Sequence, residues 1–210
     1  MALEFTKVPA DISEALQKNA GVILTEFDPT KVIDDTYRAT LKKNILFATN
    51  GGVNFTDTPE YTDGADGIDN MPSGTMEMME ISSREVKLSG TAKSVTSDAM
   101  LRLMASATKS TYKKDSVTDS GLEVFTPTDV LDISASTSMF KDLWYVCDYG
   151  TKGGFIAIYM QNTLNRDGFS IQTQNKDKGE FSFGFQAHYS ADDINTVPYK
   201  IYKRSIAKTD

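Results

Sequence analysis

A chain of 210 residues, 40% of them hydrophobic, is long enough to bury one substantial core, and we expect a single domain over residues 1–210. Its net charge of −7 argues against nonspecific binding of nucleic acid, which depends on cationic side chains that displace counterions from phosphate. We find no apolar run of the length of a membrane span or a secretion signal, and the single Cys147 excludes an intramolecular disulfide, so we expect a soluble protein of intracellular origin.

The N-terminal part is expected to contain a short helix followed by two strands. Asp11 can cap a helix over residues 11–19, which belongs to an N-terminal arm spanning residues 1–21. Residues 22–27 and 45–49 have the apolar, β-branched and aromatic composition of strands. The charged residues between them, 31–43, are expected to form a loop and lead-in.

The segment from Asn50 to Pro72 has a composition of its own. It holds four glycines among Asn, Asp, Thr and Pro, and its apolar residues are too widely spaced to form a core face. Between Asn44 and Ser83 there is no lysine or arginine, and seven acids there equal the whole net charge. We expect a long acidic loop over residues 50–75, or an extended hairpin arm, whose length indicates a task. The seven acids are Asp57, Glu60, Asp63, Asp66, Asp69, Glu77 and Glu80.

The middle of the chain predicts a strand and a helix. Residues 85–92 alternate polar and apolar side chains with period two, as a strand with one wet face should. A helix over residues 98–107, capped by Thr96 or Ser97, has an apolar stripe that we expect to pack against the sheet. Residues 109–120 are polar and are expected to be mobile. The stripe consists of Met100, Leu103, Met104 and Ala107.

The C-terminal third is dense in strand signals separated by Gly- and Asn-containing turns. In the last of these strands alternate residues form an aromatic face that we expect to be buried. Together the elements predict a mainly β protein, an antiparallel β-sandwich or barrel with one flanking α-helix. The expected strands are 122–127, 143–147, 154–160, 169–173 and 180–189, and the aromatic face consists of Phe181, Phe183, Phe185, Ala187 and Tyr189.

An enzyme mechanism has few residues to use in this sequence. The only histidine, His188, and the only cysteine, Cys147, lie in different strands, and we interpret them as a solvated residue and a core thiol. Asp63, Asp66 and Asp69 recur every three residues and could surround calcium, but the spacing is not that of an EF-hand, so a solvated acidic loop is favoured. We therefore predict no catalytic residue, no metal and no cofactor.

A β-domain with a long acidic arm and no recognisable chemical site suggests assembly. Open sheet edges can pair with the edges of a neighbouring copy, and repeated head-to-tail contacts close into rings when the rotation permits. Arms that reach across to a neighbour would explain why so many residues lie outside the expected core.

Several pieces of the sequence occur in an order and at spacings that resemble one family. They are residues 45–55, 58–63, 67–70, 140–146, 153–158, 168–173 and 181–183. The first three of these pieces read ILFATNGGVNF, TPEYTD and GIDN. In this order they resemble the major tail tube proteins of long-tailed, siphovirus-type bacteriophages. The resemblance extends from about Gly21 to Tyr202.

The resemblance implies a structural subunit that polymerises as stacked, hexameric rings into a tail tube, the conduit for viral DNA. It implies contacts with copies of itself and with the tape measure, tail tip and terminator proteins, none with a membrane, and a place in the virion after assembly in the host cytoplasm. An acidic wall would repel DNA and let it slide. In relatives the long loop joins subunits and rings, so the contact candidates are Gly51, Gly52, Phe55, Asp57, Pro59, Glu60, Tyr61, Asp63, Asp66 and Asp69.

Two other functions stay open from the sequence. A ligand- or carbohydrate-binding β-sandwich module would be expected to expose Trp or Tyr platforms, whereas the only tryptophan, Trp144, lies in an apolar strand. A tube protein of a phage-derived contractile or secretion device would share the fold, and a neighbouring sheath gene would favour it.

Overall fold

The computed structural model describes residue 12 and residues 16–31, 34–115, 118–134, 138–150, 153–173 and 175–204. Antiparallel strands dominate it, and two α-helices are present in the described residues. The strands are β1 (Gln17–Leu24), β2 (Ile45–Phe47), β3 (Thr49–Asp63), β4 (Met79–Ala92), β5 (Ala107–Asp115), β6 (Thr118–Pro127), β7 (Lys141–Tyr149), β8 (Gly154–Asn165), β9 (Ser170–Gln172), β10 (Glu180–Gln186) and β11 (Tyr199–Arg204); the helices are α1 (Asp35–Lys43) and α2 (Ser97–Leu103), with a 3-10 turn at Met76–Met78.

A nine-stranded antiparallel sheet folds over on itself to form two layers. Most of β8 pairs with β7 and β11, whereas its last residues, Leu164 and Asn165, pair with β10. Layer 1 therefore consists of β2, β1, β7, β8 and β11, and layer 2 consists of β9, β10, β4 and β3. The antiparallel sandwich predicted from the sequence is confirmed.

The bend in β8 depends on two asparagines. Asn162 adopts the left-handed conformation, with a φ of 49°, at an irregularity in the β7–β8 pairing, two residues before β8 begins to pair with β10. Asn165 is only 2% exposed, and its side chain donates to the carbonyls of Leu103 (2.7 Å) and Gly168 (2.8 Å) while accepting from the amide of Gly184 (2.8 Å). Because every polar atom of this buried amide is bonded, the bend is held without an unsatisfied group.

The main core lies between the layers. Phe183 and Phe185 of β10 pack on Phe47 with ring centroids 5.0 and 6.3 Å apart, and Leu88 of β4 is fully buried beside them. Burying each such side chain is worth about 1.5–3 kcal/mol. The aromatic face predicted for β10 is confirmed at these positions, but the strand ends at Gln186 and leaves Tyr189 exposed.

Helix α1 corrects the loop expected over residues 31–43. Asp34 caps it by accepting a hydrogen bond from the amide of Tyr37 (2.7 Å), and two lysines occupy its last turn, where the helix dipole favours cations. Tyr37 and Leu41, four residues apart, pack against the cluster of Phe27 and Phe155 at the outer face of layer 1. Only three of its nine residues, Tyr37, Ala39 and Leu41, are apolar, which is too few to show a stripe in the sequence.

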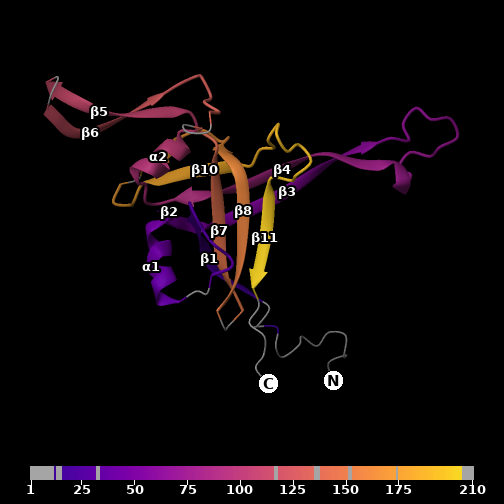
Figure 1. The fold of residues 1–210 in the computed structure, drawn as a ribbon, viewed down its shortest axis with the longest axis horizontal. Coiled ribbons are helices and arrows are strands. Elements are labelled where there is room, and N and C mark those ends of the chain that lie inside the picture. Colours follow the sequence, from indigo (N-terminus) through magenta and orange to yellow (C-terminus); the bar gives the residue numbers. More distant parts are fainter. Residues whose placement is uncertain are drawn as a thin grey trace.

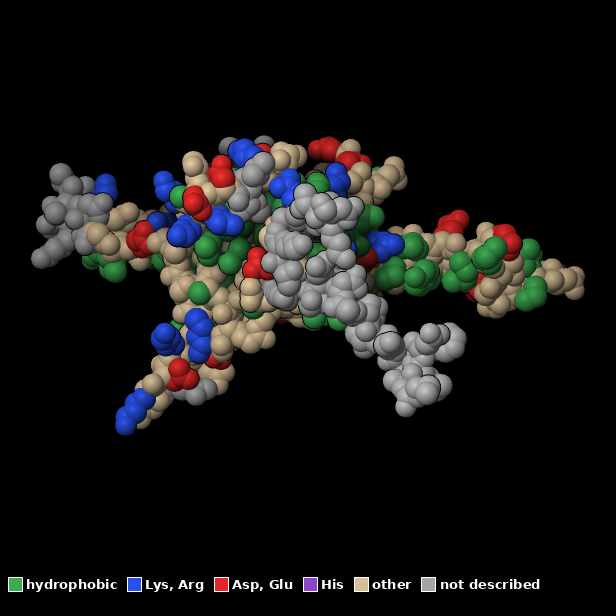
Figure 2. Space-filling view, turned by 90° about the horizontal axis from the view of Figure 1, so that it is seen from below, with side chains coloured by type: hydrophobic (Ala, Val, Ile, Leu, Met, Phe, Trp, Pro, Cys, Tyr) green, Lys and Arg blue, Asp and Glu red, His purple; other side chains and the backbone are tan. Residues whose placement is uncertain are grey.

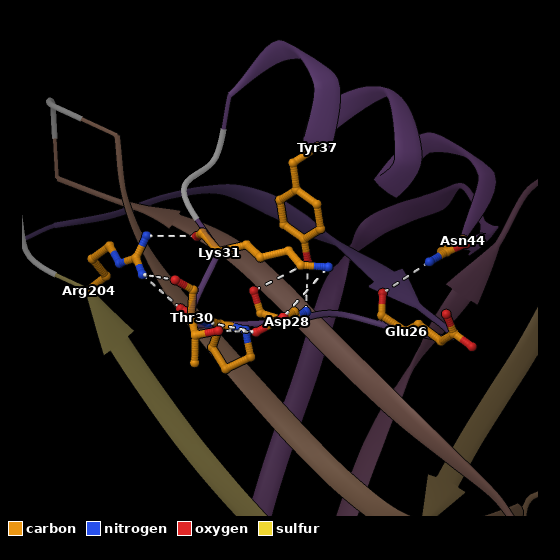
Figure 3. Close-up of polar contacts among 8 residues, drawn as sticks. Glu26, Asp28, Thr30, Lys31, Tyr37, Asn44 and Arg204 are labelled. Carbon is orange, nitrogen blue, oxygen red and sulfur yellow. Dashed lines mark hydrogen bonds and ion pairs between the residues drawn. The ribbon is translucent and has the colours of Figure 1, made fainter.

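The loop before α1 is fastened between the helix and the end of β11 (Figure 3). Arg204 donates to the carbonyls of Pro29 (2.8 Å) and Lys31 (3.0 Å). The hydroxyl of Tyr37 accepts from the amide of Asp28 (2.6 Å). These contacts hold α1 over layer 1, so this outer sheet face is covered by the chain itself.

Three further expectations are corrected. Residues 17–19, expected in a helix, lie in β1, and most of the expected N-terminal arm falls outside the described residues. Residues 109–120, expected to be polar and mobile, belong largely to the β5–β6 hairpin. Strand β11 was not anticipated at all.

The second expected helix is shorter than its apolar pattern. Thr96 is its cap, accepting from the amide of Ala99, and α2 ends at Leu103, so that Ala107 lies in β5. Leu103 is buried as expected, whereas Met100 and Met104 are half-buried.

Candidate assembly interface

The acidic segment is a hairpin that projects from the sandwich. Of the two alternatives expected from the sequence, a long loop or an extended hairpin arm, the structure has the arm. Strands β3 and β4 pair from Thr49–Ala92 at the base to Asp63–Met79 at the far end. Strand β10 covers β4 only from Lys87 to Ala92, so the part beyond is a two-stranded ribbon that projects from the body (Figure 1). We call residues 57–86 the arm.

One face of the arm continues the face that forms the core. By register, Val53 and Phe55 share a face with Leu88 and Gly90, and further out Tyr61 pairs with Ile81 on that same face. The inner residues pack in the core, but on the arm Tyr61 is 60% exposed and Ile81 is 48% exposed. Hydrophobic side chains gather along the projecting arm in Figure 2. The arm therefore presents a core-like face that the described residues of its own chain do not cover.

The far end of the arm adds further exposed apolar side chains. Met76 is 79% exposed, and Ile68 and Met71 are also exposed. Contiguous exposed apolar surface of this kind marks protein contact sites, and methionine adapts to irregular partners. Four acids (Asp66, Asp69, Glu77 and Glu80) lie exposed on the same part of the chain, so the surface is apolar and acidic together.

Asp63 organises the turn at the far end. Its carboxylate accepts hydrogen bonds from the amides of Gly74 (2.8 Å) and Ala65 (2.9 Å) and from the hydroxyl of Ser73 (2.9 Å). These bonds, led by that of the Gly74 amide, lower the pKa of Asp63. The carboxylate is thus engaged in its own turn, and Asp66 and Asp69 do not join it in a ligand set within the described residues.

The base of the arm is fixed by Asp57. One carboxylate oxygen contacts Arg84 (2.5 Å) and accepts from the hydroxyl of Tyr199 (2.7 Å), while its other oxygen is buried and has no hydrogen-bond partner in the described part of the chain. The hydrogen bond to Asp57 raises the pKa of Tyr199. Phe55 packs on the ring of Tyr199 with centroids 5.4 Å apart. These two contact candidates act within the chain, holding the arm to β11.

The remaining candidates lie along the hairpin. Gly51 and Gly52 have φ angles of 74° and 89° and form a bulge at its base, a backbone shape that favours glycine. Pro59 pairs with Arg84, and the carboxylate of Glu60 accepts from the hydroxyl of Ser83 (2.7 Å) on the polar face.

The strand edges of the hairpin are open. Among the described residues β3 pairs with β4 alone, so its other edge has no strand partner there, and both edges of the ribbon are free of described strands beyond Val86. No described strand pairs with the outer edge of β11. A two-stranded ribbon is marginally stable in water, and free edges are templates for pairing with another chain.

Cys147 and His188, the two residues considered as possible catalytic groups, are packed within the protein. Cys147 is 3% exposed, and burial raises the pKa of its thiol, which is the opposite of a nucleophile's need. His188 is not the solvated residue that we expected. Its Nδ1 lies 3.0 Å from the carbonyl of Asn162, its ring meets Phe140 edge-on, and its Nε2 is buried without a hydrogen-bond partner among the described residues.

Trp144 does not form an open platform. Its ring packs against Tyr159 (centroids 4.7 Å apart), Tyr202 (5.5 Å) and Phe27 (5.5 Å) on the outer face of layer 1. The hydroxyl of Tyr159 donates to Asp142 (2.5 Å), and its burial raises the pKa of that phenol to about 12. A shallow hollow of about 550 Å³ lies beside these rings.

Neither the family models nor the curated proteins compared with this sequence match it. No described helix combines the length and apolar character needed to span a membrane. The resemblance to tail tube proteins stays a prediction from the motifs.

Proposed function

We propose that this protein is a structural subunit that polymerises into the tail tube of a long-tailed bacteriophage. The tube would consist of stacked rings, hexameric by the resemblance, and would conduct viral DNA without reading its sequence. The observation that carries the proposal is the arm, whose core-like face has no cover within the described chain.

The energetics favour a partner for this face. Each large apolar side chain removed from water contributes about 1.5–3 kcal/mol, and the arm exposes several, among them Tyr61, Ile81 and Met76. The arm projects from one end of the body (Figure 1), and the proposed neighbour receives it on a different surface. Such heterologous contacts build closed rings or open polymers.

The alternative functions have less support. A carbohydrate-binding module would need an open aromatic platform. Trp144 is closed by rings of its own chain, and of the exposed tyrosines Tyr61 lies on the arm and Tyr112 on the β5–β6 hairpin, away from Trp144. A tube protein of a contractile or secretion device would use the same arm, and the assembled particle would distinguish it from a siphovirus tail.

The test is electron microscopy and sedimentation of purified protein over a range of concentration and salt. We expect rings or tubes with a central hole. The double variant Tyr61→Ser with Ile81→Ser should remain monomeric, while the matched variant Thr58→Ala, on the polar face of the arm, should assemble. A wild-type protein that stays monomeric at high concentration, or an arm-face variant that assembles normally, would refute the proposal.

A further inference from the structure

The exposed apolar side chains of the protein gather in two regions. Of the large apolar side chains that are exposed in the described residues, six lie on the arm and five lie on or just after the β5–β6 hairpin. Figure 1 places this hairpin at the end of the body opposite the arm. Exposed apolar side chains that lie together mark a protein contact site, so each end has one. The five are Tyr112, Leu122, Val130, Leu131 and Ile133.

The residues that follow β6 are bonded to the base of the hairpin. The hydroxyl of Ser106, directly before β5, donates to the carbonyls of Thr128 (2.7 Å) and Val130 (3.2 Å). The amide of Thr128 donates back to the carbonyl of Ser106 (3.1 Å). Val130 is nevertheless 72% exposed and Ile133 is 78% exposed. A bonded backbone therefore holds these apolar side chains at the surface.

A hollow of about 430 Å³ lies beside this segment, between the end of α2, the start of β5 and the residues before β7. Its walls include the apolar side chains of Leu101, Ala105 and Met139. The amide of Met139 donates to the carbonyl of Asp132 (2.9 Å), so one wall continues into the exposed segment. We call this hollow, together with exposed residues 130–133, the receiving surface. It offers room for a large apolar side chain of a partner.

Charges in the hollow favour an acidic partner. Arg102 and Lys141 line it, and so do Asp98 and Asp132. Asp98 contacts Arg102 (3.5 Å), and the carboxylate of Asp132 accepts from the amide (2.9 Å) and hydroxyl (2.6 Å) of Ser134. Lys141 is exposed, and in the described part of the chain no acid pairs with it. An acid carried by a partner would find an available cation here.

The far end of the arm has the complementary composition. Met76, in the 3-10 turn of the arm, is 79% exposed, and Glu77 beside it is exposed as well. An unbranched methionine side chain fits cavities of irregular shape. No lysine or arginine lies between Asn44 and Ser83, so the acids at the far end have no cation nearby in the sequence.

We propose that the receiving surface binds the far end of the arm of a second copy of this chain, with Met76 in the hollow and Glu77 beside Lys141. The inference rests on the proposed function and names the surface on which a neighbour receives the arm. Because the two regions lie at opposite ends of the subunit (Figure 1), the contact repeats from head to tail. One contact then covers apolar side chains of both regions.

A second hollow, of about 600 Å³ between α1 and β1, is less suited to the arm. Only one of the exposed large apolar side chains, Val22, lines it. Its two cations are engaged within the chain, since Arg38 contacts Asp35 (3.4 Å) and Arg204 donates to backbone carbonyls before α1. This hollow therefore serves as the control surface.

The first experiment locates the contact by crosslinking. One protein carries Met76→Cys and a second carries Thr108→Cys on the wall of the hollow, with the buried Cys147 changed to alanine in both. The two proteins are mixed under assembling conditions and treated with a short bis-maleimide. We expect a crosslinked dimer that contains one chain of each kind. Val22→Cys, at the control hollow, should give little crosslinked product with Met76→Cys.

The second experiment uses two variants that are each blocked at one end. Val130→Ser with Ile133→Ser alters the receiving surface, and Tyr61→Ser with Ile81→Ser alters the arm; all four side chains are exposed. Each variant alone should lose assembly. Their mixture should form one-to-one dimers and nothing larger in sedimentation velocity, because each pair has one intact arm and one intact receiving surface. Ile194→Ser, which removes a 67% exposed side chain outside both regions, should assemble like the wild type.

The third experiment exchanges the charges. Glu77→Lys alone, or Lys141→Glu alone, should raise the critical concentration for assembly about tenfold, because like charges then face each other in the contact. The double variant should return to within about twofold of the wild type. Glu77→Lys combined with Lys200→Glu, an exposed lysine of β11, should not be restored.

The outcomes separate the two proposals. If the wild-type protein forms no rings or tubes, both the proposed function and this inference are overturned. If it assembles but the receiving-surface variant assembles equally well, or Met76→Cys crosslinks to Val22→Cys instead of Thr108→Cys, the arm binds elsewhere and this inference alone fails. If the exchanged charges do not restore assembly, the pairing of Glu77 with Lys141 is refuted.

Discussion

The two halves of the β3–β4 hairpin follow one pattern but have different surroundings. In the half near the body, Leu88 is fully buried and Phe55 packs on the core. In the arm, the same face exposes Tyr61 and Ile81. The two strands stay paired through both halves; what changes is that β10 pairs with β4 only as far as Lys87 and that the ribbon then projects beyond the body (Figure 1).

This difference indicates that the hairpin is longer than the fold needs. Apolar side chains on a strand face stabilise the protein only when other apolar side chains cover them. Those of the near half are covered when the chain folds. The far half has the same pattern without the cover, and under the proposed function a neighbouring subunit would supply it. Folding and the proposed assembly would then use two ends of one element.

The largest effect is expected in the near half. Phe183→Ala should lower the free energy of unfolding of the monomer by about 3–5 kcal/mol, because a buried ring leaves a cavity between the layers. Tyr61→Ala in the arm should change it by less than about 0.5 kcal/mol. Urea denaturation of both variants measures the difference, and equal losses would show that the two halves are buried alike.

A smaller effect is expected at the junction of the halves. Asp57→Asn weakens the contact with Arg84 and the hydrogen bond from Tyr199, and should cost about 1.5–3 kcal/mol because these bonds involve a charged group. Glu60→Gln, which bonds only Ser83 on the exposed face, is the matched control. If both variants unfold like the wild type, Asp57 does not fix the base of the arm.

The core under the near half can also be probed with pH. Burial raises the pKa of Tyr145 to about 12, and its hydroxyl donates to the carbonyl of Ala20. Because the folded pKa lies above the unfolded value of about 10, stability is complete below pH 10 and is lost as the pH rises toward 12, by about 1–2 kcal/mol. Unfolding at several pH values measures this slope, which Tyr145→Phe should flatten.

The smallest thermodynamic effect is expected from the arm itself, where exchange of amide hydrogens is the sensitive measurement. In the monomer, amides of residues 87–92 should exchange slowly, because β4 has a partner on each side there, and those of residues 79–86 should exchange faster. Assembly should slow the second group. Equal protection of both groups in the monomer would remove the contrast between the halves.

The sequence predicted buried positions correctly where all the apolar residues of one face lie in a single strand. Alternation in β10 placed Phe183 and Phe185 in the core, and Thr96 capped a helix as expected. The arm face could not be recognised, because its apolar residues come from two strands. Tyr61 and Ile81 look isolated in the sequence and become neighbours only once the register, including the irregularity after Glu60, is known.

Polar contacts between residues far apart in the chain could not be predicted from the sequence either. The contact of Asp57 with Tyr199 joins residues 142 positions apart, and no local pattern announces it. The pairs of Lys87 with Asp167 and of Lys93 with Glu180 likewise join distant strands and turns. Composition showed the excess of acids, but it could not show which lysines they would neutralise.

The β3–β4 arm leaves one end of the body, and the β5–β6 hairpin, a separate two-stranded sheet, projects at the other (Figure 1). In the proposed polymer such a subunit would have a direction, and the polymer would inherit it. One terminus would display arms with uncovered apolar faces, and the other would display the empty surfaces that receive them. The two termini would therefore differ in chemistry, so that growth could start at one and be stopped at the other by a different protein.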